Sequence, residues 1–215
     1  MSLVGKISES YSNKPYIQSL LKLLPYWGAP DTLLQKRADE IRIDRMRAFF
    51  DELAIGQHEL TEDLIQSEDF LHCYFSTIKA ALNTRRRDKI RMMARLLNSY
   101  LSPSMNTTTD EYEELLAVLD AISFREFNVL HSLYQLEQSN PGDENNLGNI
   151  NKYWEEFKDK VMAEVKIPQK SLSAFMAKIE RTGLYLRITG GFYDYEGDKG
   201  RTTPLFGRLL AFIKE

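Results

Sequence analysis

The spacing of apolar residues predicts a mainly helical protein. Along most of the chain they recur three and four positions apart, the spacing that places side chains on one face of an α-helix. Near the N-terminus such a stripe runs through Ile17, Leu20, Leu21 and Leu24. Because this arm, residues 14–24, would otherwise leave the stripe in water, we expect it to dock on a hydrophobic surface of its own fold or of a second subunit.

Further helices should follow the segment PYWGAP, residues 25–30, whose two prolines and one glycine end the arm. In the first of these helices we expect Ile41 to face the core. Ser67 suits the N-cap of the second, and the sequence SFRE, from Ser123 to Glu126, is a capping-box signature. The expected helices cover residues 31–55, 68–82, 84–101, 110–121, 124–138, 150–165 and 169–181, with a last one from residue 204 onward.

The stretch RTGLYLRITGGFYDYEGDKGRTTPLFG, residues 181–207, differs from the rest because it predicts a β-hairpin. We expect residues 184–203 to supply the only substantial β-structure, next to the helix over 169–181. Gly183 suits the C-terminal end of that helix. Thr203 and Pro204 then open the final helix.

Residues 123–215 resemble the winged helix-turn-helix family in the order of their elements. Domains of that family are built in the order helix, loop, helix, short turn, helix, hairpin and helix. GLYLRI entering a first strand and TPLFGRLL after a polar wing carry the resemblance, although Pro204 and the aromatic, glycine-rich strand pair depart from the usual pattern. The resemblance implies binding of DNA or of protein, or dimerisation. The expected fold is mainly α, with a helical unit over residues 1–122, including the arm, packed on a winged-helix-like unit over 123–215 with a C-terminal β-hairpin.

The N-terminal helices resemble a loose group of uncharacterised bacterial proteins that includes an abortive-infection-alpha-like family. The resemblance lies in the hydrophobic rhythm and layout of IRIDRMRAFFDEL, SEDFLHCYFSTIKAALNTRRRDKIRMMARLLNSYL and DEYEELLAVLDAIS. Those helical proteins have a similar succession of helices before a winged-helix-like end. The resemblance implies a regulatory or defence-associated role and supplies no catalytic signature.

Composition and charge narrow the possible partners. The 215 residues suit one large domain or two small ones, and 43% hydrophobic with 27% charged residues is ordinary for a protein that buries a core. A net charge of -3 gives no global attraction to nucleic acid or anionic lipid. The longest apolar run, LLAVL, is too short to span a membrane, and no export signal is visible, so we expect a cytoplasmic protein without a membrane span.

The outward face of the helix over 169–181 is the first candidate contact surface. It is basic and contains no acidic residue, which suits a phosphate backbone or a partner protein, although an ordinary solvated face is the other interpretation. Two observations disfavour DNA: residues 123–215 contain as many acidic as basic residues, and the tip of the hairpin contains Asp194, Glu196 and Asp198. The candidate contact residues are Lys170, Ser171, Lys178, Arg181 and, on the hairpin, Arg201.

A second candidate surface lies in the run NTRRRDKIRMMARLL. Arg87, Arg91 and Arg95 recur four residues apart beside Arg86, and we call these four residues the basic stripe. The stripe would grip phosphate or an acidic partner, or it would be a solvated face bridged to acidic helices such as DEYEE, residues 110–114.

Catalytic chemistry has little support in the sequence. His58, His72 and His131 are scattered without metal-binding spacing, and Cys73 lies in the apolar run FLHCYF, which favours a buried thiol. We therefore predict no metal, no cofactor and no catalytic residues. The favoured function is a non-enzymatic protein-interaction role with a protein partner or as a homo-oligomer. A winged-helix DNA-binding regulator is the alternative, and a hydrolase whose catalytic groups are scattered in sequence is a third possibility.

Overall fold

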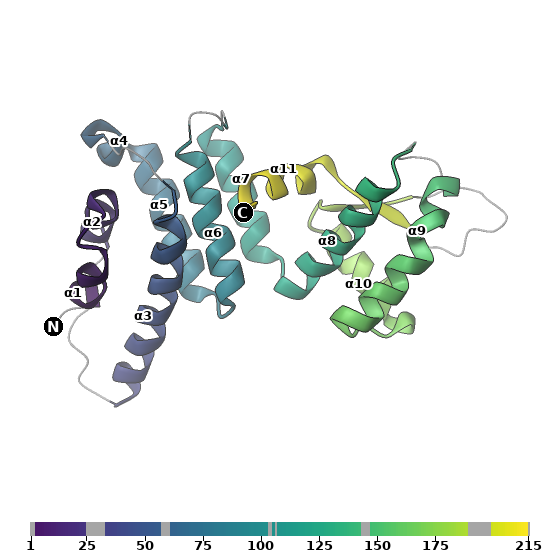
Figure 1. Cartoon of the computed structure of the whole chain (residues 1–215), viewed down its shortest axis with the longest axis horizontal. Coiled ribbons are helices and arrows are strands. Elements are labelled where there is room, and N and C mark those ends of the chain that lie inside the picture. The colour runs from purple at the N-terminus through teal and green to yellow at the C-terminus, as the bar shows by residue number, and fades with distance from the viewer. Residues whose placement is uncertain are drawn as a thin grey trace. The chain divides into compact units, whose positions relative to one another are not determined.

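The computed structural model describes residues 3–24, 33–56, 61–102, 105, 107–142, 147–188 and 199–214. The protein is mainly α, with a small two-stranded antiparallel hairpin near its C-terminal end (Figure 1), which confirms the predicted fold class. The chain forms two compact units. The first unit consists of Met1–Asp120 with Phe212–Glu215, and the second of Ala121–Ala211.

The first unit is built from helices. Its centre is α3, which packs against α1, α5 and α6. The N-cap that the sequence predicted at Ser67 is present, since its hydroxyl accepts a hydrogen bond from the Phe70 amide at 3.3 Å. The elements are α1 (Leu3–Ser8), a 3-10 turn (Glu9–Tyr11), α2 (Pro15–Lys22), α3 (Leu33–Leu53), α4 (Glu62–Gln66), α5 (Glu68–Asn83), α6 (Arg87–Tyr100) and α7 (Thr109–Ala121).

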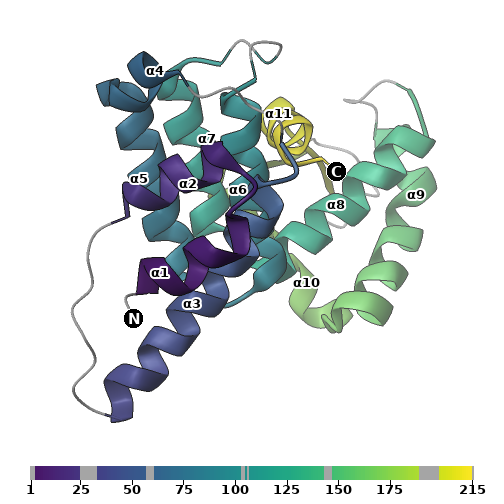
Figure 2. The ribbon, with the colours of Figure 1, turned by 60° about the vertical axis from the view of Figure 1, so that its left-hand side comes forward.

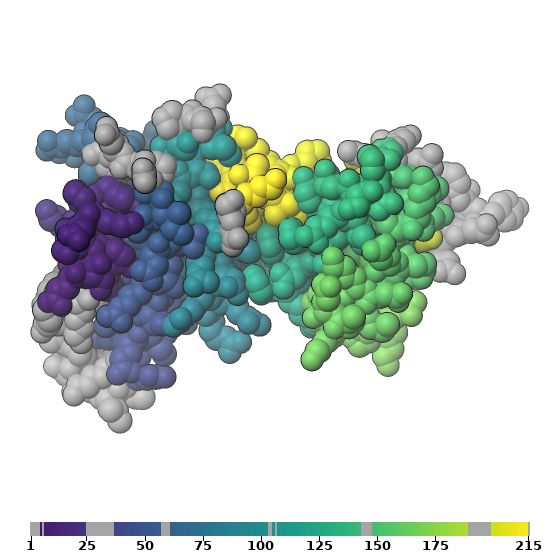
Figure 3. Space-filling view, in the orientation of Figure 1, coloured from purple at the N-terminus to yellow at the C-terminus, as the bar shows by residue number. Residues whose placement is uncertain are grey.

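The N-terminal arm docks on its own fold, as the sequence predicted. Figure 3 shows the N-terminal segment, in purple, next to the blue of α3, and α1 packs against α3. The Tyr74 hydroxyl of α5 donates to the Leu20 carbonyl at 2.7 Å, and the Tyr16 hydroxyl donates to the Leu53 carbonyl at 2.6 Å. The second bond satisfies a carbonyl at the C-terminal end of α3, which has no partner inside the helix. The apolar side chains of the arm are buried: Ile17, Leu20, Leu21 and Leu24.

Two details of these helices differ from the prediction. Met46 and Phe49 are buried in the core, but Ile41 is 40% exposed, so its predicted inward orientation is wrong. At about 100° per residue Ile41 lies only about 20° around the helix from Ala48, which is buried, so the helical period alone does not account for the exposure of Ile41. Helix α6 begins at Arg87 instead of residue 84, because Thr84 and Arg86 have extended backbone conformations.

The described residues of the second unit form three α-helices, a hairpin and most of a fourth helix. Helices α8 and α9 lie side by side (Figure 2), and β1 packs against α10. The predicted capping box is present: Ser123 accepts from the Glu126 amide and the Glu126 carboxylate accepts from the Ser123 amide. The elements are α8 (Phe124–Ser139), α9 (Leu147–Lys160), a π-helical turn (Val161–Val165), α10 (Gln169–Glu180), β1 (Tyr185–Arg187), β2 (Gly200–Thr202) and α11 (Pro204–Ile213).

The hairpin confirms the predicted position of the β-structure, because β1 and β2 are the only strands in the described part of the chain. They pair antiparallel with Leu186 opposite Arg201. Gly183, between α10 and β1, has a φ of 74°, a conformation that favours glycine. Within the described ranges no helix is long and apolar enough to cross a membrane.

Candidate functional site

The basic stripe faces two carboxylates of α3. The Arg87 guanidinium pairs with Asp44, and Arg95 Nε donates to Glu52 Oε1 at 2.6 Å. Asp44 and Glu52 are eight residues apart, as are Arg87 and Arg95, so the two pairs join α3 and α6 at matched positions. Two helices that run in the same direction with this spacing form a ladder of ion pairs. The positive charge of the stripe is therefore largely offset inside the first unit.

Burial changes along the ladder. The Arg87 side chain is 60% exposed and that of Arg95 is 19% exposed. Arg91, between them, lies 3.9 Å from Glu52 and 3.7 Å from Asp88, because α3 has no carboxylate at the intermediate position, which is occupied by Ala48. Arg95 and Glu52 thus form the least solvated pair of the stripe.

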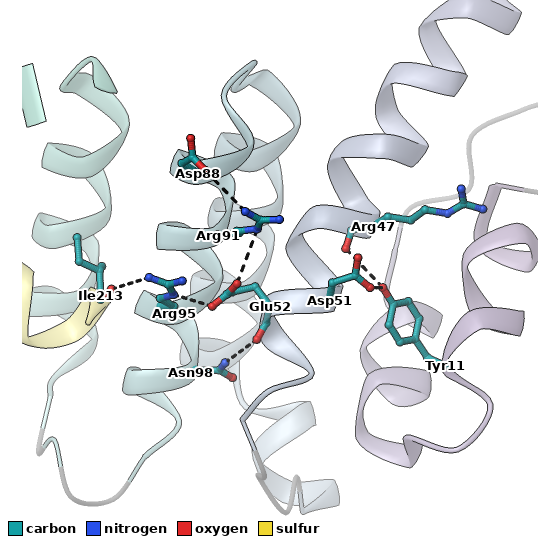
Figure 4. A network of polar contacts seen from close by, with 9 residues as sticks. All are labelled: Tyr11, Arg47, Asp51, Glu52, Asp88, Arg91, Arg95, Asn98 and Ile213. Carbon is teal, nitrogen blue, oxygen red and sulfur yellow. Dashed lines mark hydrogen bonds and ion pairs between the residues drawn. The ribbon is translucent and has the colours of Figure 1, made fainter. Parts of the chain in front are cut away.

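The same end of the ladder holds the last turn of α11. Arg95 Nη1 donates to the Ile213 carbonyl at 3.3 Å, and the Ser99 hydroxyl donates to the Phe212 carbonyl at 2.7 Å. Figure 4 shows Arg95 between Glu52 and this carbonyl, with Arg91 approaching the same carboxylate. A cation at a helix C-terminus is favourable because the final carbonyls have no partner inside the helix. Arg95 therefore bonds both the Glu52 carboxylate of α3 and the Ile213 carbonyl of α11.

Another face of α3 anchors the N-terminal segment. The Tyr11 hydroxyl donates to Asp51 Oδ1 at 2.6 Å (Figure 4). Burial and this hydrogen bond raise the pKa of Tyr11, so the phenol keeps its proton. Lys14 Nζ donates to the Ala54 carbonyl at 2.5 Å, just beyond the C-terminal end of α3. These contacts are structural, because they tie the N-terminal segment to α3 and to the residue that follows it.

The predicted contact face of α10 is exposed. Lys170, Ser171, Lys178 and Arg181 all lie at the surface. Lys170 and Arg181 have no side-chain partner among the residues that the structure describes. The single acidic residue of the helix, Glu180, is partly buried and pairs with Arg187 at 3.5 Å. The exposed face of α10 therefore combines basic and small side chains without a carboxylate.

Lys178 differs from its neighbours because it pairs with a buried carboxylate of α8. Its Nζ lies 2.8 Å from Glu126 Oε1, and only 3% of the Glu126 side chain is exposed. Burial alone would raise the pKa of Glu126, but the bonds from Lys178 and Ser123 outweigh burial and hold the pKa below its usual value. Lys178 thus has a role inside the second unit that the sequence did not indicate.

The hairpin residues are only partly described. Arg201 lies on β2, partly buried, and its neighbour Thr202 is bonded through its amide to Glu137 Oε1 at 2.8 Å. The acidic residues predicted at the hairpin tip, Asp194, Glu196 and Asp198, lie outside the described residues. The structure therefore places Arg201 on a strand that is joined to α8 through the neighbouring Thr202.

An apolar groove lies between α3 and α5, on the side of α3 where the prediction failed. It has a volume of about 620 Å³. Ile41 and Phe75, which are 40% and 42% exposed, both line it. This groove was not predicted from the sequence, because Ile41 was expected inside and Phe75 was not singled out. The lining residues are Ala38, Ile41, Arg42, Arg45, Phe75, Ile78, Lys79, Leu82 and Asn83.

The remaining residues considered for chemistry are separated in the fold. His72 pairs with Glu113 at 2.9 Å on an exposed surface, whereas His131 stacks on Phe127 at a centroid distance of 5.9 Å. Cys73 is buried, and burial raises the pKa of its thiol to about 11. Within the described ranges no three His, Cys, Asp or Glu residues are grouped to hold a metal ion; His58 lies outside them. Comparison with family models, curated proteins and solved structures finds no match to this chain.

Proposed function

We propose that this chain is a non-enzymatic interaction protein that binds a partner protein in the α3–α5 groove, in a bacterial regulatory or defence-associated role. The observation that carries the proposal is the gathering of Ile41 and Phe75 in one groove. Exposed apolar side chains are ordinary when scattered, but a concave cluster of them is typical of a binding site. The helix-rich fold supports such a role, since a groove between two helices accepts a third helix.

The proposal can be tested by site-specific photo-crosslinking in cells of the source organism. A benzoylphenylalanine in place of Phe75 should give a discrete protein adduct, and Ile41→Ser in the same chain should abolish it. The matched control is the same probe in place of Ile55, an exposed residue of the first unit that does not line the groove. Equal adducts from both positions, or none from position 75, would contradict the proposal.

A winged-helix DNA-binding regulator remains the second candidate, and the acid-free exposed face of α10 favours it. In this alternative Lys170, Lys178 and Arg181 contact phosphates. Three contacts would give a slope of roughly -2.7 for log affinity against log salt, which is a weak grip. The pairing of Lys178 with Glu126 lowers the charge that this face offers to a backbone. We therefore rank this function below protein binding.

Duplex binding across a salt titration tests this alternative. Pooled genomic fragments of the source organism serve as the probe, and the double variant Lys170→Glu/Arg181→Glu is compared with wild type. Lys152→Glu, an exposed lysine on α9, is the matched control. We expect no sequence-selective binding at about 150 mM salt. Sub-micromolar, selective binding that only the double variant abolishes would promote the DNA-binding function above the protein-binding one.

A further inference from the structure

We propose that the occupant of the α3–α5 groove is an acidic amphipathic helix of a partner protein. This inference rests on the proposed function and adds the chemistry of the partner. The groove is lined by both apolar and polar residues. We call the apolar ones the floor, namely Ala38, Ile41, Phe75, Ile78 and Leu82, and the polar ones the rim, namely Arg42, Arg45, Lys79 and Asn83, of which the first three are basic.

The positive charge of the rim favours a partner with negatively charged side chains. None of the described residues that line the groove carries a carboxylate. Asp39 lies 3.1 Å from Arg42 and offsets the positive charge of that arginine. Arg45 instead donates to the neutral Leu82 carbonyl, and no described carboxylate offsets its positive charge. Lys79 is exposed and forms no ion pair with any described residue. About two positive charges beside the apolar floor therefore remain uncompensated, and complementary carboxylates on the partner would fix its register and speed its association.

The shape of the groove selects a short helix. The α3 wall runs from residue 38 to 45 and the α5 wall from 75 to 83, which corresponds to roughly 10–12 Å, or about two helical turns. Two turns of an amphipathic helix present apolar side chains at positions i, i+3 or i+4, and i+7, enough to cover Ile41 and Phe75. Carboxylates that flank this stripe would lie over the rim.

Fluorescence anisotropy with designed peptides tests the inference on the full chain. Three labelled 18-residue helical peptides share one leucine stripe and differ only in flanking residues, which are glutamate, lysine or glutamine. The glutamate peptide should bind at least about 10-fold more tightly than the lysine peptide at low salt, and the difference should shrink as salt rises. Ile41→Ser should lower the affinity for the glutamate peptide about 5-fold, since the complex would no longer bury part of an isoleucine side chain.

Control variants separate the floor from the rim. Ile55→Ser, an equally apolar exposed site outside the groove, should leave binding unchanged, and Lys79→Glu should reverse the preference between glutamate and lysine peptides. Lys22→Glu, an exposed lysine on α2, is the charge control. Circular dichroism and thermal unfolding check that each variant is folded.

The outcomes distinguish this inference from the proposed function. If the three peptides bind equally, or the lysine peptide binds best, and Ile41→Ser weakens them, the groove binds protein but the acidic chemistry is wrong. If Ile41→Ser changes the affinity for none of the peptides, both proposals fail. If light scattering shows a dimer that Ile41→Ser dissociates, the occupant is a second copy of the chain, and the inference of an acidic partner is overturned.

Discussion

The ladder between α3 and α6 predicts that replacing its three arginines one at a time has graded effects on stability. We consider Arg87→Met, Arg91→Met and Arg95→Met, since methionine keeps the length of the side chain and suits a helix. All three remove a positive charge from one face of α6. They differ in burial, because the side chains are 60%, 46% and 19% exposed in chain order.

Burial sets the expected magnitudes. An exposed ion pair contributes about 0.2–1 kcal/mol, so Arg87→Met should cost about 0.5 kcal/mol and Arg91→Met a similar amount. Arg95→Met leaves the 11%-exposed Glu52 side chain with Arg91, at 3.9 Å, as its remaining cationic partner among the described residues, and it also removes the bond to the Ile213 carbonyl. Losing one partner of a largely buried charged pair costs about 3–5 kcal/mol, and the remaining arginine reduces this to about 2 kcal/mol.

Cys73 provides a reporter of opening in the first unit, because it is buried in α5. Its labelling by a thiol reagent is followed as a function of urea concentration. With a slope of about 2 kcal/mol per molar urea, Arg95→Met should lower the midpoint by about 1 M and Arg87→Met by about 0.3 M or less. Equal shifts for the two variants would refute the ladder. So would a stabilising Arg87→Met, the result expected if the stripe were a set of mutually repelling, unpaired cations.

Three smaller predictions follow. The Cys73 thiol should resist labelling in native buffer and react once denatured, since burial raises its pKa to about 11; rapid native labelling would contradict its buried position. Burial, helped by the charge of Lys160, lowers the pKa of His131 in the folded state, so stability should be lost as pH falls below the unfolded value of about 6.5; His131→Gln should reduce this loss in urea titrations at successive pH values. Gly183→Ala should cost about 1–2 kcal/mol because its φ of 74° strains any side chain, and unchanged thermal unfolding would contradict this.

The helices could be predicted from the sequence wherever a local signal existed. Ser67 and the pair Ser123 and Glu126 marked helix starts because each of these side chains accepts a hydrogen bond from a backbone amide three residues away. Helix α4 was missed because its five residues are not buried and leave no apolar stripe. Local chemistry thus predicted most boundaries, and a helix without a buried face gave no pattern.

The candidate site was harder to predict because it depends on distant pairs. Arg95 was identified as part of a stripe, but its partner Glu52 lies 43 residues earlier in the chain. The shared eight-residue spacing of Asp44 and Glu52 was a usable signal, once α3 and α6 were assumed to lie together. For Ile41 there was no such signal, since an apolar pattern does not show which of its members meets a neighbour.

Methyl NMR of the isoleucine-labelled full chain tests the central claim, that the α3–α5 groove binds an acidic helix, most directly. Titration with the glutamate peptide should shift the methyl signals of Ile41 and Ile78, which line the groove, and leave Ile55 and Ile179 unchanged. The shifts should saturate at one peptide per chain. Saturable shifts centred on Ile179 of α10, with Ile41 and Ile78 unmoved, would contradict the account.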